Sequence, residues 1–140
     1  MRHQPTNTCD YELDVTVGDI DEMGHVNNAV YLTWVQAAVL CHWRRFAPKD
    51  VADARLWVAL KHEISYLHPA FLNDHVVVRA ALQKQLGARA FYRTAINRGG
   101  DVLAEVESCW CCLDSVTRKP VRLTRDIVAR FLPAEATHHT

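Results

Sequence analysis

Residues 19–34 read DIDEMGHVNNAVYLTW and change pattern near their middle. The segment Gly18–Asn28 is dense in Gly, Asp and Asn and shows no hydrophobic period, which predicts a loop. From Ala29 onward, apolar residues recur at steps of three and four, which predicts a helix with one broad apolar face that ends before Pro48. That face consists of Tyr31, Trp34, Val35, Ala38, Val39, His42, Trp43 and Phe46.

The chain on both sides of this helix predicts strands. Before it, Tyr11–Val17 alternates apolar and polar residues, the period of a half-buried strand. After it, four segments alternate in the same way and are joined by short turn signals, which is typical of antiparallel neighbours. These segments are Leu56–Tyr66, Val76–Leu86, Ala88–Asn97 and Val102–Leu113. A short helix at Arg125–Phe131, capped by Thr124, completes the pattern.

The order of one strand, one long helix and four strands predicts an α+β domain, in which a mainly antiparallel sheet of about five strands wraps the helix. A chain of 140 residues forms one domain by default, so we expect a single domain over residues 1–140 with its core at about 9–132. The helix is apolar over more of its surface than five strands cover comfortably, so we also expect dimerisation.

Composition excludes several classes of function. The 16 Lys and Arg residues balance 16 Asp and Glu residues, so no overall field attracts nucleic acid or a membrane surface. No apolar run reaches the roughly 20 residues of a membrane span, and the absence of a secretory signal favours a cytoplasmic protein. The odd count of five Cys residues indicates reduced thiols, and Cys109, Cys111 and Cys112 alternate in direction on a strand, so no metal site is expected.

The loop before the long helix gathers three carboxylates, one His and two Asn residues. If the helix begins near Asn28, its unpaired N–H groups can bind a partially negative oxygen, which outlines an oxyanion hole. A carboxylate such as Asp21 could then deprotonate a water molecule or attack an acyl carbon. The residues alone leave a second interpretation open, in which Asp and Asn only make turns and Asn27 or Asn28 caps the helix.

The pattern D-x-D-x-x-G-H-V-N-N-x-x-Y-x-x-W within residues 19–34 resembles the signature of hotdog-fold thioesterases of the 4-hydroxybenzoyl-CoA thioesterase type. The resemblance extends through nearly the whole chain and includes Leu72–Val76, Gly87–Phe91, Leu103–Val106 and Arg118–Leu123. It implies a hotdog fold, a homodimer or homotetramer, and hydrolysis of an acyl-CoA thioester to a free acid and CoA. No cofactor is implied, and an acyl carrier protein is the other acyl donor to consider.

The resemblance also assigns roles to residues of the loop. Asp21 matches the catalytic carboxylate, which acts as nucleophile or general base, and Gly24 and His25 match the positions where backbone N–H groups polarise the thioester carbonyl. Met23 stands where related acyl-carrier-protein thioesterases have a catalytic Asn, and Asn28 stands where another branch has a His. These departures favour a scheme of one carboxylate and backbone donors.

Substrate contacts follow from the same resemblance. Asn28 and Tyr31 are expected at the site, with Tyr31 packed over it. The phosphates of CoA require Arg or Lys, and Arg89 follows the Gly87 turn where the family places basic or hydroxyl groups. Arg93 shares the strand face of Arg89, and the alternative for both is a solvated side chain. Because the family's pocket usually lies between subunits, the strand residues His62, Glu63 and Tyr66 could contribute from either chain.

Two other functions remain open from the sequence. The domain could bind acyl-CoA or an acylated carrier protein without hydrolysing it. It could also be a hotdog hydratase or dehydratase, but the spacing from His to Pro-Gly that is characteristic of those enzymes is missing.

Overall fold

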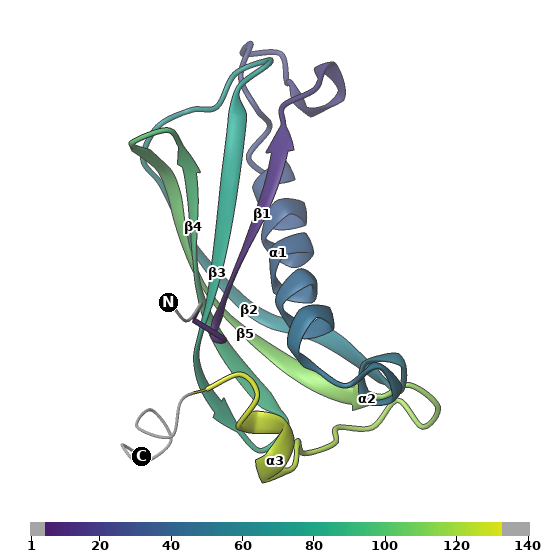
Figure 1. Ribbon diagram of the computed structural model, residues 1–140. Helices are drawn as coiled ribbons and strands as arrows, with labels where there is room; N and C mark the ends of the chain where they lie inside the picture. The colour runs from purple at the N-terminus through teal and green to yellow at the C-terminus, as the bar shows by residue number, and fades with distance from the viewer. Residues whose placement is uncertain (1–4, 133–140) are drawn as a thin grey trace.

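The structure is a computed structural model and describes residues 5–132, so the predicted domain extends beyond the described residues at both ends. One antiparallel sheet, with the strand order β1-β3-β4-β5-β2, curves around the long helix α1 (Figure 1). The strands are β1 (Thr8–Asp14), β2 (Arg55–Tyr66), β3 (His75–Leu86), β4 (Arg89–Arg98) and β5 (Asp101–Asp114), and the helices are α1 (Val30–Phe46), α2 (Lys49–Asp53) and α3 (Arg125–Val128). This arrangement confirms the predicted α+β class and is the hotdog fold.

The limits of β2 to β5 agree with the prediction to within one residue. The predicted first strand exists, but its limits are wrong by three residues at each end. It lies at Thr8–Asp14 instead of Tyr11–Val17, because pairing with β3 ends where Asp14 faces His75. Beyond that point the Thr16 N–H donates to the Asp19 carboxylate (3.0 Å), and the chain turns into a short 3-10 helix. The sequence pattern also misses α2 and makes α3 longer than it is.

The core lies between α1 and the concave face of the sheet. The α1 side chains Tyr31, Trp34, Val35, Ala38, Val39, His42 and Trp43 are buried, as the helical period predicts. Every second residue of β3 and β4 faces them, so Val78 and Ile96 are buried whereas Arg79 and Arg93 lie on the opposite, wet face. No helix within residues 5–132 is both long and apolar enough to cross a membrane.

The segment around α3 closes the core at the C-terminal end of α1 (Figure 1). The rings of Trp43 and Phe131 stack with their centroids 5.3 Å apart, and Ile127 and Leu132 are also buried. Aromatic contacts of this kind add to the apolar area that they bury. The C-terminal end of α1 is therefore fixed by the segment around α3.

His42 is a polar residue inside this core. Its Nε2–H donates to the Thr6 carbonyl oxygen (2.7 Å), and Nδ1 accepts from the Tyr92 hydroxyl (2.6 Å), so both ring nitrogens of the neutral imidazole are satisfied. The side chain is fully buried. Burial is the main reason that its pKa is lowered, and the nearby Arg45 acts in the same direction.

The variant His42→Gln tests the energetic consequence of this burial. Because the pKa of His42 is depressed on folding, the unfolded chain takes up the proton first, and stability is lost as the pH falls below about 6.5 toward the folded-state pKa. We expect the free energy of unfolding of the wild type to fall more steeply than that of His42→Gln between about pH 7 and about pH 5, with one group contributing at most about 1.4 kcal/mol per pH unit.

Urea unfolding followed by circular dichroism measures both curves. His75 acts in the opposite sense, because Asp14 and Glu12 raise its pKa, but it is present in both proteins and cancels in the comparison. If the free energy of unfolding had the same pH dependence in both proteins, His42 would not have the lowered pKa that its burial requires.

Candidate active site

The loop between β1 and α1 folds into a small hairpin at the end of the sheet where β2 stops and β3 begins (Figure 1). Ile20 and Val26 form an isolated antiparallel bridge at its base. At its tip the Gly24 N–H donates to the Asp21 carbonyl oxygen (3.1 Å), and Gly24 has a φ of +84°. Residues with a side chain rarely adopt this left-handed conformation, so the turn depends on Gly24.

Ala70 connects this hairpin to the helix. Its carbonyl oxygen accepts from the Val26 N–H (2.8 Å), and its own N–H donates to the Tyr31 hydroxyl oxygen (3.2 Å). Ala70 is fully buried, so both bonds are shielded from water. The position of the hairpin relative to the start of α1 is therefore fixed.

The N-cap of α1 is Ala29 and has no side-chain cap hydrogen bond, so the prediction that Asn27 or Asn28 caps the helix is wrong. Asn27 instead makes a turn that leads into the helix. The Asn27 side-chain oxygen accepts from the Ala29 N–H (2.9 Å), and the Asn27 carbonyl accepts from the Val30 N–H (2.9 Å). The helix proper begins one residue later than expected, at Val30. Asn28 has a different contact, since its carbonyl oxygen accepts from the Tyr66 hydroxyl (3.1 Å).

A cavity of about 270 Å³ opens beside this helix start. It is lined by His25, Val26, Asn28, Tyr31, Tyr66, Leu67, His68 and Pro69. Within the described part of the chain, the backbone N–H groups of His25 and Asn28 have no hydrogen-bond partner, whereas the Gly24 N–H is engaged in the turn. His25 and Asn28 thus both line the cavity and have backbone N–H groups that are free to donate.

The Asp21 carboxylate lies close to this cavity without lining it. One carboxylate oxygen is 3.8 Å from Nδ1 of His25, which is too long for a hydrogen bond. The same oxygen accepts from the Met23 N–H (2.8 Å), and 26% of the Asp21 side chain is exposed. The backbone N–H of Met23 thus orients the carboxylate.

Arg89 is distant from Asp21 within the chain. It lies opposite Cys111 on β5, and Cys111 lies opposite Val58 on β2. Tyr66, at the cavity, is eight residues further along β2, which corresponds to about 26 Å of extended strand. The structure therefore brings Asp21, His25, Asn28 and Tyr31 together, and places Arg89 at the other end of the sheet.

The other proposed strand residues are spread over different surfaces. Arg93 lies on the wet face of the sheet, 3.3 Å from Glu105, and lines a larger cavity of about 510 Å³ together with Glu63. His62 lines a third cavity of about 330 Å³ between α1 and β2. His68 was missed at the sequence level, although its place in the connection after a strand is typical of site residues.

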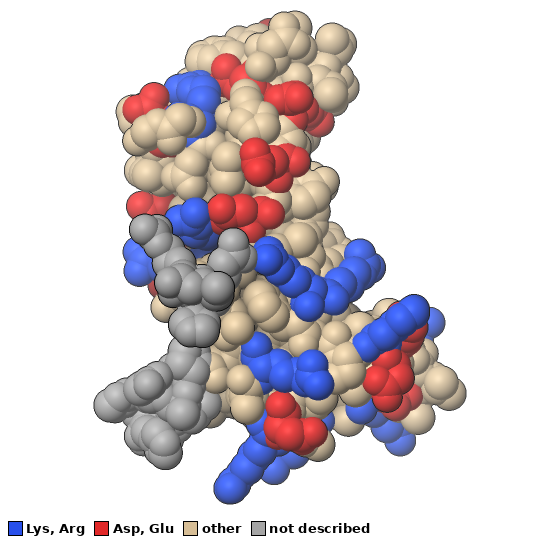
Figure 2. Space-filling model, in the orientation of Figure 1, with Lys and Arg blue, Asp and Glu red and all other residues tan. Residues whose placement is uncertain are grey.

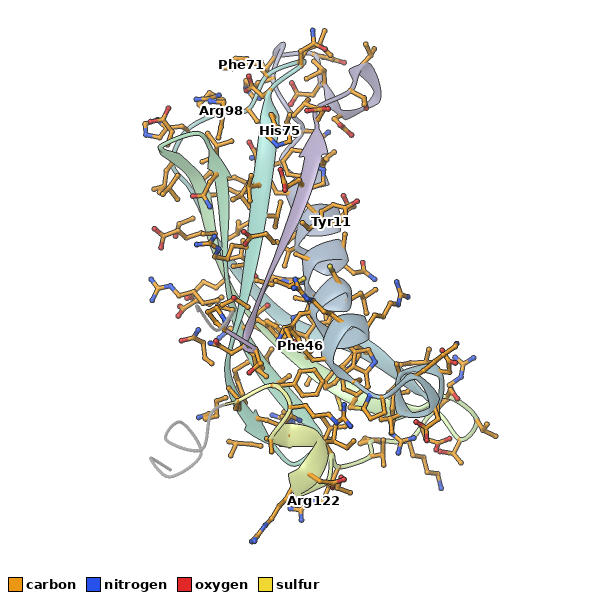
Figure 3. The ribbon with its side chains drawn as sticks, viewed as in Figure 1. Tyr11, Phe46, Phe71, His75, Arg98 and Arg122 are labelled. Carbon is orange, nitrogen blue, oxygen red and sulfur yellow. The ribbon has the colours of Figure 1, made fainter. Side chains whose placement is uncertain are left out.

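Charge is distributed unevenly along the molecule. Acidic side chains gather along β1 and the loop that follows it, whereas Arg and Lys side chains predominate near α3 and the far end of α1 (Figure 2). At the basic end, Arg122 packs against Gly87 in the turn before Arg89. Arg122 and Phe71 lie at opposite ends of the molecule (Figure 3). The end near Phe71 carries Arg98, but this side chain is already paired with the carboxylates of Asp74 (2.8 Å) and Asp101 (3.6 Å).

Comparison with known proteins agrees with this architecture. The thioesterase-like superfamily matches residues 15–131 of the chain. Acyl-CoA thioester hydrolase YbgC of Escherichia coli is 27% identical over 117 residues, which cover 81% of this chain and 87% of YbgC. Long-chain acyl-CoA thioesterase FadM of Escherichia coli is 27% identical over 115 residues, covering 77% and 85% of the two chains.

Solved structures show the same fold. A thioesterase from Thermus thermophilus, crystallised with coenzyme A and Zn, superimposes with a TM-score of 0.76 at 25% identity, covering 88% of this chain and 90% of the other. The protein TT1821, also from Thermus thermophilus, gives a TM-score of 0.78 at 21% identity, covering 88% and 96%. With its family match spanning nearly the whole described chain, this protein belongs to the thioesterase-like superfamily.

Proposed function

We propose that this chain hydrolyses acyl-CoA thioesters to a free acid and CoA, and that it needs no cofactor for this reaction. The observation that carries the proposal is the placement of a carboxylate, Asp21, beside a cavity bordered by two unpaired backbone N–H groups. The names of the two Escherichia coli relatives and the CoA complex of the Thermus thermophilus thioesterase support the same substrate class.

Backbone donors polarise the thioester. The thioester carbonyl oxygen accepts hydrogen bonds from the N–H groups of His25 and Asn28, and these bonds strengthen as negative charge develops on the oxygen. The helix α1 begins at Val30, and the positive end of its dipole adds to this stabilisation. Because these groups are already in position, little reorganisation is needed during the reaction.

Asp21 supplies the attack on the carbonyl carbon. Its carboxylate either adds to this carbon directly or takes a proton from a water molecule that adds to it. The C–S bond then breaks, and the CoA sulfur leaves as a thiolate. A thiol has an ordinary pKa of about 8.5, so the thiolate leaves without a strong general acid. This chemistry agrees with a site that relies on one carboxylate and backbone donors.

The acyl group extends along the groove between α1 and β2. A second cavity, of about 330 Å³, lies in this direction beside the next turns of α1. Its lining is largely apolar and consists of Leu32, Thr33, Gln36, Trp57, Val58, Ala59, His62 and Trp110. Apolar walls with a few polar groups are typical of small-molecule sites, and they fit an acyl chain or ring.

The substitution Asp21→Asn tests the chemical role of the carboxylate. We expect kcat/KM for acyl-CoA hydrolysis to fall by about 100-fold or more, because the amide is neither a base nor a nucleophile. The measurement is the release of CoA thiol from a panel of short, medium, long and aromatic acyl-CoAs. Glu22→Gln is the matched control, since Glu22 is an exposed neighbour, and its activity should be unchanged.

Equal activity of Asp21→Asn and the wild type would exclude Asp21 from the chemistry. Binding of acyl-CoA by the wild type without any thiol release would instead favour a binding protein.

The functional unit is a dimer that pairs through β2. The two edges of the sheet are β1 and β2. The edge at β1 is short and carries Asp10, Glu12 and Asp14, and charges of this kind discourage pairing. The edge at β2 is longer and exposes the apolar side chains Leu56, Val58, Leu60 and Tyr66. Long apolar edges of this kind pair with another strand.

Antiparallel pairing of two β2 strands brings complementary ends together. A two-fold axis near His62 places Val58 of the partner subunit level with Tyr66, because the two residues are equally distant from His62 along β2. Arg89 of the partner subunit lies level with that Val58. The basic end of one protomer then lies beside the acidic end that carries Asp21, and can bind the phosphates of CoA.

Arg89→Ala tests phosphate binding independently of the chemistry. We expect KM for acyl-CoA to rise about 10- to 100-fold with little change in kcat, which corresponds to the loss of a charge-assisted hydrogen bond. The control substrate is the corresponding acyl-pantetheine, which lacks the nucleotide and phosphates. Wild type and variant should hydrolyse acyl-pantetheine equally. An equal loss on both substrates would show that Arg89 acts on structure and not on the phosphates.

A mixture of Asp21→Asn and Arg89→Ala tests whether the two residues act across the dimer. After subunit exchange at equal concentrations, half of the dimers are mixed, and each has one intact site out of two. We therefore expect about a quarter of wild-type activity at low acyl-CoA concentration, well above the sum of the two variants alone. Activity equal to that sum would assign Arg89 to the site of its own chain.

A further inference from the structure

Two cysteine thiols meet where β1 packs on α1. The sulfur atoms of Cys9, on β1, and Cys41, on α1, are 2.9 Å apart, and both residues are free thiols. A disulfide bond has an S–S length of about 2.05 Å, so bond formation requires these atoms to approach by less than about 1 Å. Figure 1 shows β1 running alongside α1, and the two residues are 32 positions apart in the chain.

The other cysteines are not arranged in this way. Cys109, Cys111 and Cys112 lie on the single strand β5. Cys109 and Cys111 are two residues apart, so their Cα atoms are separated by about 6.6 Å, near the upper limit for a disulfide, and their side chains stand parallel. Cys111 and Cys112 point to opposite faces. Within residues 5–132, the pair on β1 and α1 is therefore the one in which two sulfurs face each other.

The two thiols differ in their access to solvent. Cys9 is 3% exposed, whereas Cys41 is only partly buried. Burial raises the pKa of the Cys9 thiol to about 11, the neighbouring Cys41 adds to this rise, and Arg45 opposes it. A buried thiol with a raised pKa reacts slowly with a dissolved oxidant. Cys41 is thus the thiol that a dissolved oxidant reaches first. Cys9 is the buried thiol that can then react with the oxidised Cys41.

We propose that Cys9 and Cys41 are a redox site that closes to an intramolecular disulfide when the protein meets a peroxide. The Cys41 sulfur attacks one oxygen of hydrogen peroxide, the O–O bond breaks, and one water leaves, which produces a sulfenic acid on Cys41. The Cys9 sulfur then attacks the Cys41 sulfur, the S–O bond breaks, and a second water leaves. In total, two thiols and one peroxide give one disulfide and two waters.

The bond would restrain the segment that carries the candidate active site. A link between Cys9 and Cys41 closes a loop that contains residues 19–31, the hairpin and the start of α1. Closing a loop of this length stabilises the fold mainly by restricting the unfolded chain. The oxidised protein should therefore unfold at a higher temperature than the reduced protein, by about 5–10 °C.

The test uses the full chain, first reduced and then treated with one equivalent of hydrogen peroxide. The protein is then unfolded in guanidinium chloride, the remaining thiols are blocked with N-ethylmaleimide, and the intact mass and peptide map are measured. We expect the loss of two hydrogens, a cross-linked pair of peptides that contain Cys9 and Cys41, and alkylation of Cys109, Cys111 and Cys112. The rise in melting temperature should disappear after addition of dithiothreitol.

Three variants separate this site from general oxidation. In Cys9→Ser, peroxide should stop at a sulfenic acid on Cys41, which dimedone traps. In Cys41→Ser, Cys9 should remain a thiol under the same conditions. Cys109→Ser, which removes another partly buried thiol, should form the cross-link as the wild type does. A cross-link within β5, or oxidation of Cys41 to a sulfinic acid with Cys9 still present, would overturn the proposal.

Discussion

The burial of α1 against one face of the sheet is the constraint on which the rest of the structure depends. Most inward-facing residues of the central strands are apolar because they face this helix, with Thr94 and Ser108 as polar exceptions, and Trp43 and Tyr31 fix the two ends of the helix. Once α1 is fixed, the hairpin before it must lie at the end of the sheet. The unpaired N–H groups at that end, and the carboxylate of Asp21, are thus positioned by the packing of the core.

The separation of chemical groups along the molecule links the fold to the assembly. In the proposed mechanism, the groups that polarise and attack the carbonyl lie at one end of the molecule, and Arg89, which is proposed to hold the phosphates, lies at the other. A long, bipartite ligand such as an acyl-CoA needs both. A single copy of the chain would have to span the length of its own sheet, whereas two antiparallel copies bring opposite ends side by side. The exposed apolar edge at β2 supports the second arrangement.

Sequence periodicity was sufficient for most of the fold. The alternation in Leu56–Tyr66 predicts a strand, and the spacing of apolar residues after Ala29 predicts a helix. Both patterns can be recognised within one segment, without knowledge of its neighbours in the fold. The first strand was misplaced because its end is set by pairing with β3, at Asp14 and His75. The distance of Arg89 from Asp21 and the contact between Cys9 and Cys41 likewise depend on register and packing between distant segments, which periodicity does not contain.

The acidic residues of β1 have a consequence for solubility. A sheet with two unprotected edges can add further copies on both sides, and such growth leads to fibres. In this protein, Asp10, Glu12 and Asp14 alternate along one edge, so two β1 strands brought together would align like charges. In the proposed dimer, pairing through the β2 edge alone stops at two chains. The acidic residues of β1 thereby disfavour growth of the sheet at this edge.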